Sequence, residues 1–266
     1  MSALHEHSLS PAEIYEEAFV PALFQQWGDV MTEAASVGFG HRVLDVACGT
    51  GVAACAAAER AGAQGSVVGL DPNSDMLAVA AFKHPLVEWR EGRGEALPFP
   101  DASFDRVVSQ FGLMFFDDPA AGLREMMRVL RTGGKLAVAV CDALDHSPGY
   151  AVLVELLHRL FGPPVADAFR APFILGDQDR LQMLCLDAGL SEAGIERRDG
   201  NVHFASISDL ITTERACAWT LGGILDDEEF DRLDREAQVS LLPFQHENGW
   251  IDFTMPALIV SAQKAP

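Results

Sequence analysis

The sequence predicts an α/β fold with a doubly wound, mostly parallel sheet, and three stretches carry this prediction. Residues 43–51 (Val-Leu-Asp-Val-Ala-Cys-Gly-Thr-Gly) begin with the apolar and β-branched residues of a buried strand and end in a glycine turn. The alanine-rich run 52–61 then favours a helix. A second apolar run ends at Asp71, and residues 135–141 are apolar nearly throughout, as a buried parallel strand should be. A strand, a glycine turn and a helix in succession are typical of a nucleotide-binding unit.

The glycine turn is compatible with two kinds of ligand. Gly49-x-Gly51-x-x-Ala54 satisfies the loose dinucleotide fingerprint, and Asp71 lies at a suitable distance for a ribose-binding acid. Asp45 argues against a dinucleotide, because a carboxylate beside the turn would repel an anionic pyrophosphate. S-adenosylmethionine (SAM) carries an ammonium and a sulfonium group and no phosphate, so an acid suits it. We therefore favour SAM as cofactor, and an NAD-dependent oxidoreductase is the alternative.

Four motifs between about residues 40 and 141 resemble those of class I SAM-dependent methyltransferases. Residues 44–51 resemble the first motif and residues 67–73 the second. Residues 97–105 (Leu-Pro-Phe-Pro-Asp-Ala-Ser-Phe-Asp) resemble the signature of the ubiquinone/menaquinone-biosynthesis type (methyltransferase type 11), and residues 128–134 resemble the turn before the fifth strand. The resemblance implies a Rossmann-like seven-stranded sheet with an antiparallel last strand. It also implies an enzyme that transfers a methyl group from SAM to a small molecule.

The resemblance also implies a set of cofactor-binding residues. Asp71 would accept hydrogen bonds from both ribose hydroxyls, and Met76 would lie against the adenine. At Arg93 the family usually has an aspartate that accepts from the adenine amino group. Arginine has no acceptor, so Arg93 stacks on the adenine, Glu95 replaces the aspartate, or backbone groups alone contact the base. The full set is Tyr15, Asp45, Ala47, Cys48, Gly49, Thr50, Gly51, Asp71, Pro72, Asn73, Met76, Arg93, Gly94, Glu95, Gln110 and Phe111.

No catalytic residue follows from the motifs, because methyl transfer from a sulfonium needs orientation and exclusion of water more than acid–base groups. Positioning alone contributes about 7–11 kcal/mol in favourable cases. A general base would help an acidic acceptor, and His146, His158 and His203 lie in segments expected to shape the acceptor pocket. The alternative for each is a structural histidine. The histidines and cysteines show no metal-ligand spacing, so no metal is expected.

Residues 1–36 are interpreted as an N-terminal helical lid, with Tyr15 and Phe19 over the cofactor cleft and a break or a new helix start at Pro21. The alternative is a helix that packs on the main domain. Residues 37–266 form the SAM-binding domain, with helical insertions at about 143–175 and 206–243 after the fifth and sixth strands. The other expected strands are 86–92, 104–109, 194–198 running on toward 204, and 257–262. The other expected helices are 74–82, 119–130 ending at the turn 132–134, 177–188, 208–221 and 226–242.

The acceptor pocket is expected from residues 1–36, 111–116, 143–175 and 204–225, which are rich in apolar and aromatic residues and include Trp219. Phe115 or Phe116 would contact the acceptor. This composition predicts a small apolar or aromatic acceptor, such as a quinone precursor or a polyketide. Methylation at oxygen, carbon or nitrogen stays open, and so does a non-catalytic SAM-binding protein.

The composition narrows the range of partners and compartments. The chain has 266 residues, 49% of them apolar, and a net charge of −20 with 19 basic residues. This acidity argues against nucleic acid and against an anionic membrane surface. We see no signal peptide and no membrane-spanning run. The five scattered cysteines predict reduced thiols in a cytoplasmic protein, and a homodimer is open.

Overall fold

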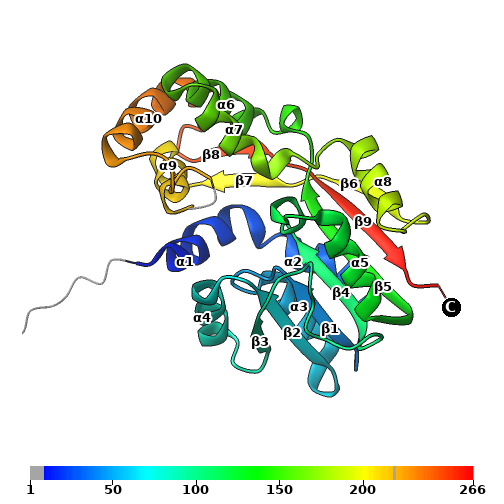
Figure 1. Cartoon of the computed structure of the whole chain (residues 1–266). Helices are drawn as coiled ribbons and strands as arrows, with labels where there is room; N and C mark the ends of the chain where they lie inside the picture. The colour runs from blue at the N-terminus through cyan, green and yellow to red at the C-terminus, as the bar shows by residue number, and fades with distance from the viewer. Residues whose placement is uncertain (1–8, 218–219, 266) are drawn as a thin grey trace, which may run out of the picture.

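A seven-stranded sheet forms the centre of the molecule in a computed structural model that describes residues 9–217 and 220–265 (Figure 1). The strand order is β3-β2-β1-β4-β5-β9-β6; the pairs formed among β1 to β5 are parallel, and β9 is antiparallel to both of its neighbours. The predicted fold class, including the antiparallel last strand between the fifth and sixth, is confirmed. The strands are β1 Arg42–Val46, β2 Ser66–Asp71, β3 Glu88–Glu91, β4 Phe104–Gln110, β5 Leu130–Cys141, β6 Gly194–Arg198 and β9 Ala257–Gln263.

Helices cover both faces of this sheet. One pair consists of α2 (Trp27–Ala34) and α3 (Val52–Ala61), which contact each other; α3 contacts β1, and α2 contacts β4 and β5. Another consists of α5 (Pro119–Val129) and α8 (Gln178–Asp187), while α4 (Ser74–Lys83) packs near the β2–β3 edge. The central strands are buried on both faces, which is why they are apolar in sequence. Short 3₁₀ turns are η2 Gly62–Gln64, η3 Leu113–Phe115, η4 Leu144–His146, η5 Ala171–Phe173 and η6 Leu242–Phe244.

A second layer of helices lies beyond the carboxyl ends of the strands, in the upper part of Figure 1. It contains α6 (Pro148–Phe161), α7 (Pro163–Arg170), α9 (Ile207–Ala216) and α10 (Asp227–Ser240). These helices lie in the two stretches where the sequence predicted insertions, with α9 shorter than expected. Trp219 lies outside the described residues, as do residues 1–8 of the predicted lid.

The sixth strand differs from its prediction, because residues 201–204 do not continue β6. They form β7 (Asn201–Phe204), which pairs antiparallel with β8 (Ile251–Thr254) in a separate two-stranded sheet. The chain turns at Gly200, where a side chain would overlap the Trp27 ring at 2.2 Å. Apolar patterning showed that the residues are extended but not which partner they pair with.

The predicted turn at residues 132–134 lies within the bounds of β5, which starts at Leu130, and the pairing with β4 is irregular there: Phe104 pairs with Leu130, and Arg106 pairs with Lys135. The backbone N–H of Gly133 donates to the Lys264 carbonyl, and the Lys264 N–H donates to the Gly134 carbonyl, both at 2.9 Å. Pairing with the C-terminal strand therefore extends β5 through two glycines. Local turn chemistry cannot reveal a partner that lies 130 residues away.

The N-terminal segment is helical as predicted, but Pro21 does not break it. After α1 (Pro11–Ile14), which starts with a Ser10–Glu13 capping box, the chain continues as a π-helix, η1 (Tyr15–Phe24), around Pro21. A proline lacks the N–H of a regular helix, and the wider turn accommodates it. The segment thus crosses the ends of the strands without interruption.

Within the described residues, no helix is long and apolar enough to cross a membrane. No group of three or more His, Cys, Asp or Glu side chains in the same part of the chain could hold a metal ion. None of the five cysteines, all of which lie among the described residues, forms a disulfide, and four of them are buried.

Candidate functional site

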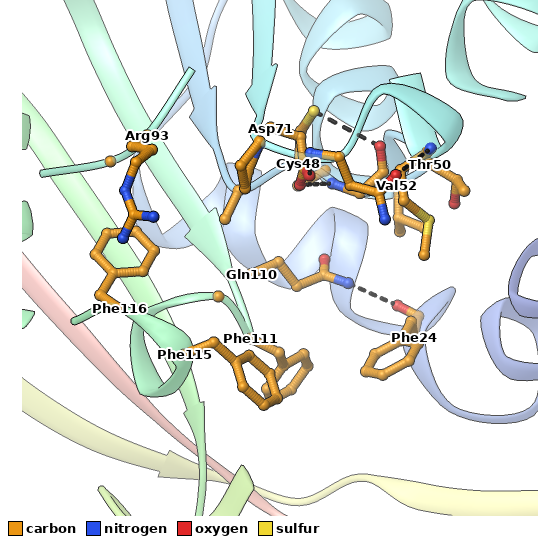
Figure 2. Close-up of a pocket in the computed structure, with 18 of the residues that line it drawn as sticks. Phe24, Cys48, Thr50, Val52, Asp71, Arg93, Gln110, Phe111, Phe115 and Phe116 are labelled. Carbon is orange, nitrogen blue, oxygen red and sulfur yellow. Dashed lines mark hydrogen bonds between the residues drawn. The ribbon is translucent and has the colours of Figure 1, made fainter. Parts of the chain in front are cut away.

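A cavity of about 300 Å³ lies at the carboxyl ends of β1, β2 and β4 (Figure 2). All the predicted cofactor-binding residues except Asp45 and Gly51 line it. They are Tyr15, Ala47, Cys48, Gly49, Thr50, Asp71, Pro72, Asn73, Met76, Arg93, Gly94, Glu95, Gln110 and Phe111. Residues from five separate stretches of sequence therefore meet at one place.

Asp71 organises the floor of this cavity. Its Oδ2 accepts a hydrogen bond from the Gly49 N–H (2.9 Å), and its Oδ1 accepts one from the Asn73 N–H (2.8 Å). Burial raises the pKa of this carboxyl, and the two backbone donors oppose that shift. A carboxylate has about four acceptor positions, so each oxygen keeps room for another donor, such as a hydroxyl. Asp71 thus joins the glycine turn to α4 and still faces a ligand.

The glycine turn and the loop after β4 brace each other. Ala47 and Phe111 both have positive φ angles (56° and 54°), which cost a residue with a side chain roughly 1–2 kcal/mol each. A side chain at Gly112 would lie 2.5 Å from the Ala47 Cβ, so the two loops are in close contact. This packing holds strained backbone at two positions on the cavity wall.

Buried oxygen atoms without partners also lie at this end of the sheet. Thr50 Oγ1, Gln110 Oε1 and both carboxyl oxygens of Asp45 have no hydrogen bond within the described part of the chain. All of them can accept hydrogen bonds, and buried polar groups are normally paired. Thr50 and Gln110 line the cavity, so a ligand that carries ammonium or hydroxyl donors would fit these two acceptors.

The prediction that Asp45 lines the cavity is wrong. Its side chain is 0% exposed and lies behind the turn formed by Ala47 and Cys48, which do line the cavity. Burial raises the pKa of Asp45 to about 8; the Ala54 N–H favours the charged form, and Asp71 opposes it. The carboxyl is therefore mostly protonated at neutral pH, and it does not face the cavity.

Gly51 is also absent from the cavity lining, because its role is in packing. A Cβ on Gly51 would lie 2.4 Å from the Trp89 ring, and one on Gly69 would lie 2.3 Å from it. Trp89 thus covers the outer side of the turn, and only glycine leaves room for the indole.

We expect Gly51→Ala to lower the free energy of unfolding by about 1–3 kcal/mol more than Gly189→Ala. Both glycines have positive φ angles (92° and 84°), but a Cβ at Gly189 would meet nothing within 4 Å. Backbone strain is therefore common to both variants, and overlap with Trp89 is specific to Gly51. Urea unfolding of the two variants measures the difference, and equal losses would contradict the packing role.

Arg93 lies at one edge of the cavity beside Phe116 (Figure 2). Its guanidinium pairs with Asp117 and with Glu95 Oε1 (3.3 Å), and the same Glu95 oxygen accepts from the Asp117 N–H (2.9 Å). These carboxylates raise the pKa of Arg93, Glu95 first. Of the predicted alternatives, an acceptor role for Glu95 is the most restricted, because one of its oxygens already takes two hydrogen bonds.

The N-terminal segment closes the other side of the cavity. Tyr15 and Phe24 stack with ring centroids 5.3 Å apart, and Phe24 packs against Phe111 at 5.7 Å. The Gln110 Nε2 donates to the Phe24 carbonyl at 3.2 Å, which ties η1 to the end of β4 (Figure 2). The π-helix therefore forms a wall of the cavity.

A second, smaller cavity of about 70 Å³ adjoins the first. Tyr15, Phe24, Phe111 and Phe115 line both cavities, and we call these four residues the aromatic partition. The remaining lining residues are mostly apolar: Phe19, Leu23, Met114, Cys141, Tyr150, Phe169, Pro172, Phe173, Glu214, Cys217, Thr220 and Met255. They come from the four stretches predicted to build the acceptor pocket, with Cys141 and Met255 as additions.

The three candidate histidines line neither cavity. His146 is half-exposed with its Nδ1 2.8 Å from Asp142, and His158 is exposed on α6. His203 pairs with Asp252 and stacks on Trp250 at 4.2 Å. Their placement gives none of them contact with a ligand in either cavity, so the general-base prediction for them fails on geometry.

Sequence reasoning missed several residues of the two cavities. Phe24, Val52, Ala53 and Gly112 line the first one and sit next to predicted residues in sequence. Glu214 is more important, because it is the only charged side chain among the described residues that line the second cavity. Its one sequence signal is an acid on the apolar side of the predicted helix 208–221.

The fold and the cavity define a class I SAM-dependent methyltransferase. A family model described as a methyltransferase domain matches residues 44–138. A demethylmenaquinone methyltransferase of Renibacterium salmoninarum is 35% identical over 188 residues, which are 67% of this chain and 78% of that protein. The chain therefore belongs to the ubiquinone/menaquinone-biosynthesis type of SAM-dependent methyltransferases. A C-methyltransferase of ubiquinone/menaquinone biosynthesis from Stenotrophomonas maltophilia is 46% identical, over 42% of this chain and 47% of that protein.

Solved structures agree on the fold. The YcgJ protein of Bacillus subtilis superposes with a TM-score of 0.61 at 20% identity, over 91% of this chain and 99% of that one. Phosphoethanolamine N-methyltransferase 2 of Haemonchus contortus, in complex with SAM, also has a TM-score of 0.61 at 17% identity, over 99% and 59%. The matches favour the methyltransferase over the NAD-dependent oxidoreductase.

Proposed function

We propose that this enzyme methylates a small, aromatic, quinone-type acceptor, and that the acceptor binds in the second cavity. The observation that carries the proposal is the aromatic partition, which places an apolar chamber directly beside the predicted cofactor cavity. The relatives named above act in menaquinone and ubiquinone biosynthesis, which supports a quinone-type ring and a carbon atom as the site of methylation.

The residues that line the first cavity suit each part of SAM. Asp71 would hold the ribose, and the turn at Ala47, Cys48 and Gly49 would face the methionine part, where the unpaired acceptors Thr50 and Gln110 suit an ammonium. The adenine would lie between Met76 and the Arg93 edge. When bound, SAM supplies a methyl group on a sulfonium that leaves as a neutral thioether.

The contribution of the protein is mainly to position the two reactants. Because the partition consists of four aromatic side chains, the acceptor and the methyl donor would meet beside a largely apolar surface that holds both in place. We propose that residues 1–36 act as the cover of the site, since η1 walls both cavities, and that residues 37–266 form the catalytic domain with the insertions at about 143–175 and 206–243. The net charge of −20 supports a protein without a nucleic-acid partner. A cytoplasmic location and a homodimer stay predictions.

Titration calorimetry with SAM and with NAD tests the cofactor, and we expect binding of SAM only. Mass spectrometry of reactions with SAM and a set of naphthohydroquinones then tests the acceptor, and we expect a product heavier by one methyl group. NAD binding without SAM binding would refute the methyltransferase. SAM binding with no methylated product from any ring in the set would favour the non-catalytic protein.

A further inference from the structure

We propose that Glu214, held by Thr220, accepts the proton of a hydroxyl group on the aromatic acceptor, and so selects phenolic acceptors. The proposal rests on the proposed function, because it assigns a role within the same acceptor chamber. It replaces the histidines as the source of acid–base chemistry.

Glu214 is buried and faces the acceptor chamber, which is the position that a general base requires. It lies near the end of α9 with 3% of its surface exposed, yet it lines the second cavity. The Thr220 hydroxyl donates to Glu214 Oε2 at 3.1 Å. A hydroxyl has one proton, so this bond fixes the carboxylate without neutralising it. The second oxygen of Glu214 is not engaged by Thr220.

The surroundings of Glu214 are apolar and aromatic. Tyr150 packs against Phe169 (5.7 Å) and Phe173 (5.9 Å), which makes flat faces for a ring on the side away from the cofactor. No Lys, Arg or His is among the described residues that line this chamber. A carboxylic acid in an aromatic chamber can recognise the hydroxyl of a ring that stacks there.

Burial raises the pKa of Glu214 to about 8, and the Thr220 hydroxyl opposes that shift. Among the charged side chains of the packed elements, Glu16 of η1 pairs with Lys83, Asp227 and Asp231 of α10 pair with Arg215, and His203 of β7 pairs with Asp252. The titratable groups that share the chamber are the side chains of Tyr15, Tyr150, Cys141 and Cys217. Glu214 is therefore a stronger base than an ordinary glutamate, and closer to a phenol in proton affinity.

The reaction balances with these groups alone. Ionised Glu214 takes the O–H proton of the acceptor, and the resulting phenolate directs its electron pair through the ring carbon to the SAM methyl group. The C–CH₃ bond forms as the S–CH₃ bond breaks, and that bond pair stays on sulfur as the neutral thioether. The ring carbon then loses its hydrogen as a proton and the oxygen regains one. One proton per turnover leaves through Glu214 to solvent.

The central test is Glu214→Gln, which keeps the shape of the side chain and an oxygen that can accept from Thr220. We expect kcat with a naphthohydroquinone to fall by about 100-fold or more, because general base catalysis contributes about 10²–10⁴-fold. The SAM dissociation constant should stay unchanged, since Glu214 does not line the first cavity. Wild-type kcat should rise with pH to a plateau above about 8, and the Gln variant should lose this rise.

Glu155→Gln is the matched control, because Glu155 is an exposed glutamate on α6, and it should leave kcat and its pH profile unchanged. Thr220→Val should give a smaller loss of kcat and a shifted pH profile. Wild-type kcat retained in Glu214→Gln, with the same pH profile, would overturn the proposal.

A binding measurement separates this proposal from the proposed function. We expect 1-naphthol to bind the complex with S-adenosylhomocysteine at least tenfold more tightly in the wild type than in Glu214→Gln, as read by naphthol fluorescence. Such binding without any methyl transfer by the wild type would refute the proposed function and leave hydroxyl recognition supported. Equal naphthol binding by both proteins, or tighter binding of naphthalenemethylamine than of naphthol, would overturn the recognition of a hydroxyl.

Discussion

Asp71→Ala will weaken SAM binding by about 2–4 kcal/mol, or roughly 30- to 1,000-fold, because the variant loses hydrogen bonds to a charged acceptor. The same carboxylate holds the Gly49 and Asn73 N–H groups, so the turn also loses its anchor. Asp71→Asn keeps one oxygen acceptor and should lie between the wild type and Asp71→Ala. Titration calorimetry with SAM measures all three proteins.

Asp75→Asn is the appropriate control for this prediction. Asp75 is an exposed acid in the first turn of α4, four residues from Asp71, and its removal changes the charge near the site by the same amount. SAM affinity should change little in this variant. If Asp71→Ala folds and binds SAM with unchanged affinity, the ribose does not lie where we place it.

Asp45→Asn will stabilise the free enzyme at alkaline pH. The Asp45 carboxyl ionises at about pH 3.8 in the unfolded chain, whereas its folded pKa is about 8. The folded state therefore holds an extra proton between these values, and the free energy of unfolding falls as pH rises from about 4 to about 8. We expect the variant to exceed the wild type by about 3–5 kcal/mol at pH 8, and by little below pH 4.

We also expect Asp45 to release a proton when the cofactor binds. The positive charges of SAM near the turn favour ionised Asp45, so the wild type should release up to one proton per SAM at pH 7. Calorimetry in two buffers of different ionisation enthalpy measures this number, and Asp45→Asn should reduce it. Parallel unfolding curves for the two proteins from pH 4 to 8, with equal proton release, would show that Asp45 is ionised in the free enzyme.

The cofactor cavity could be predicted largely from the sequence, because its chemistry is local. The turn at Ala47 to Gly49 follows its own strand directly, and Asp71 ends the next strand, so parallel pairing alone brings them together. Gly51 and Asp45 show the limit of that reasoning. Both residues belong to the motif, but the Trp89 ring occupies the space beside Gly51, and Asp45 is fully buried behind the turn.

The sequence predicted which segments form the acceptor chamber, but not which acidic side chain lines it. Glu214 stands in the sequence Thr-Thr-Glu-Arg, and its one signal is its position on the apolar side of the helix. Its burial depends on the packing of α9 against α10 and η1, and no local pattern encodes those contacts. An imidazole is the usual general base near neutral pH, whereas the acid that lines this chamber is a glutamate whose pKa is raised by an environment that tertiary structure creates.

The aromatic partition has a thermodynamic consequence for the binding of two ligands to the enzyme. Tyr15, Phe24, Phe111 and Phe115 are walls common to two compartments, so any occupant of one orders side chains that the other must also order. The second occupant then loses less conformational entropy, and each ligand raises the affinity of the other by the same factor. We therefore expect heterotropic cooperativity between the methyl donor and the acceptor.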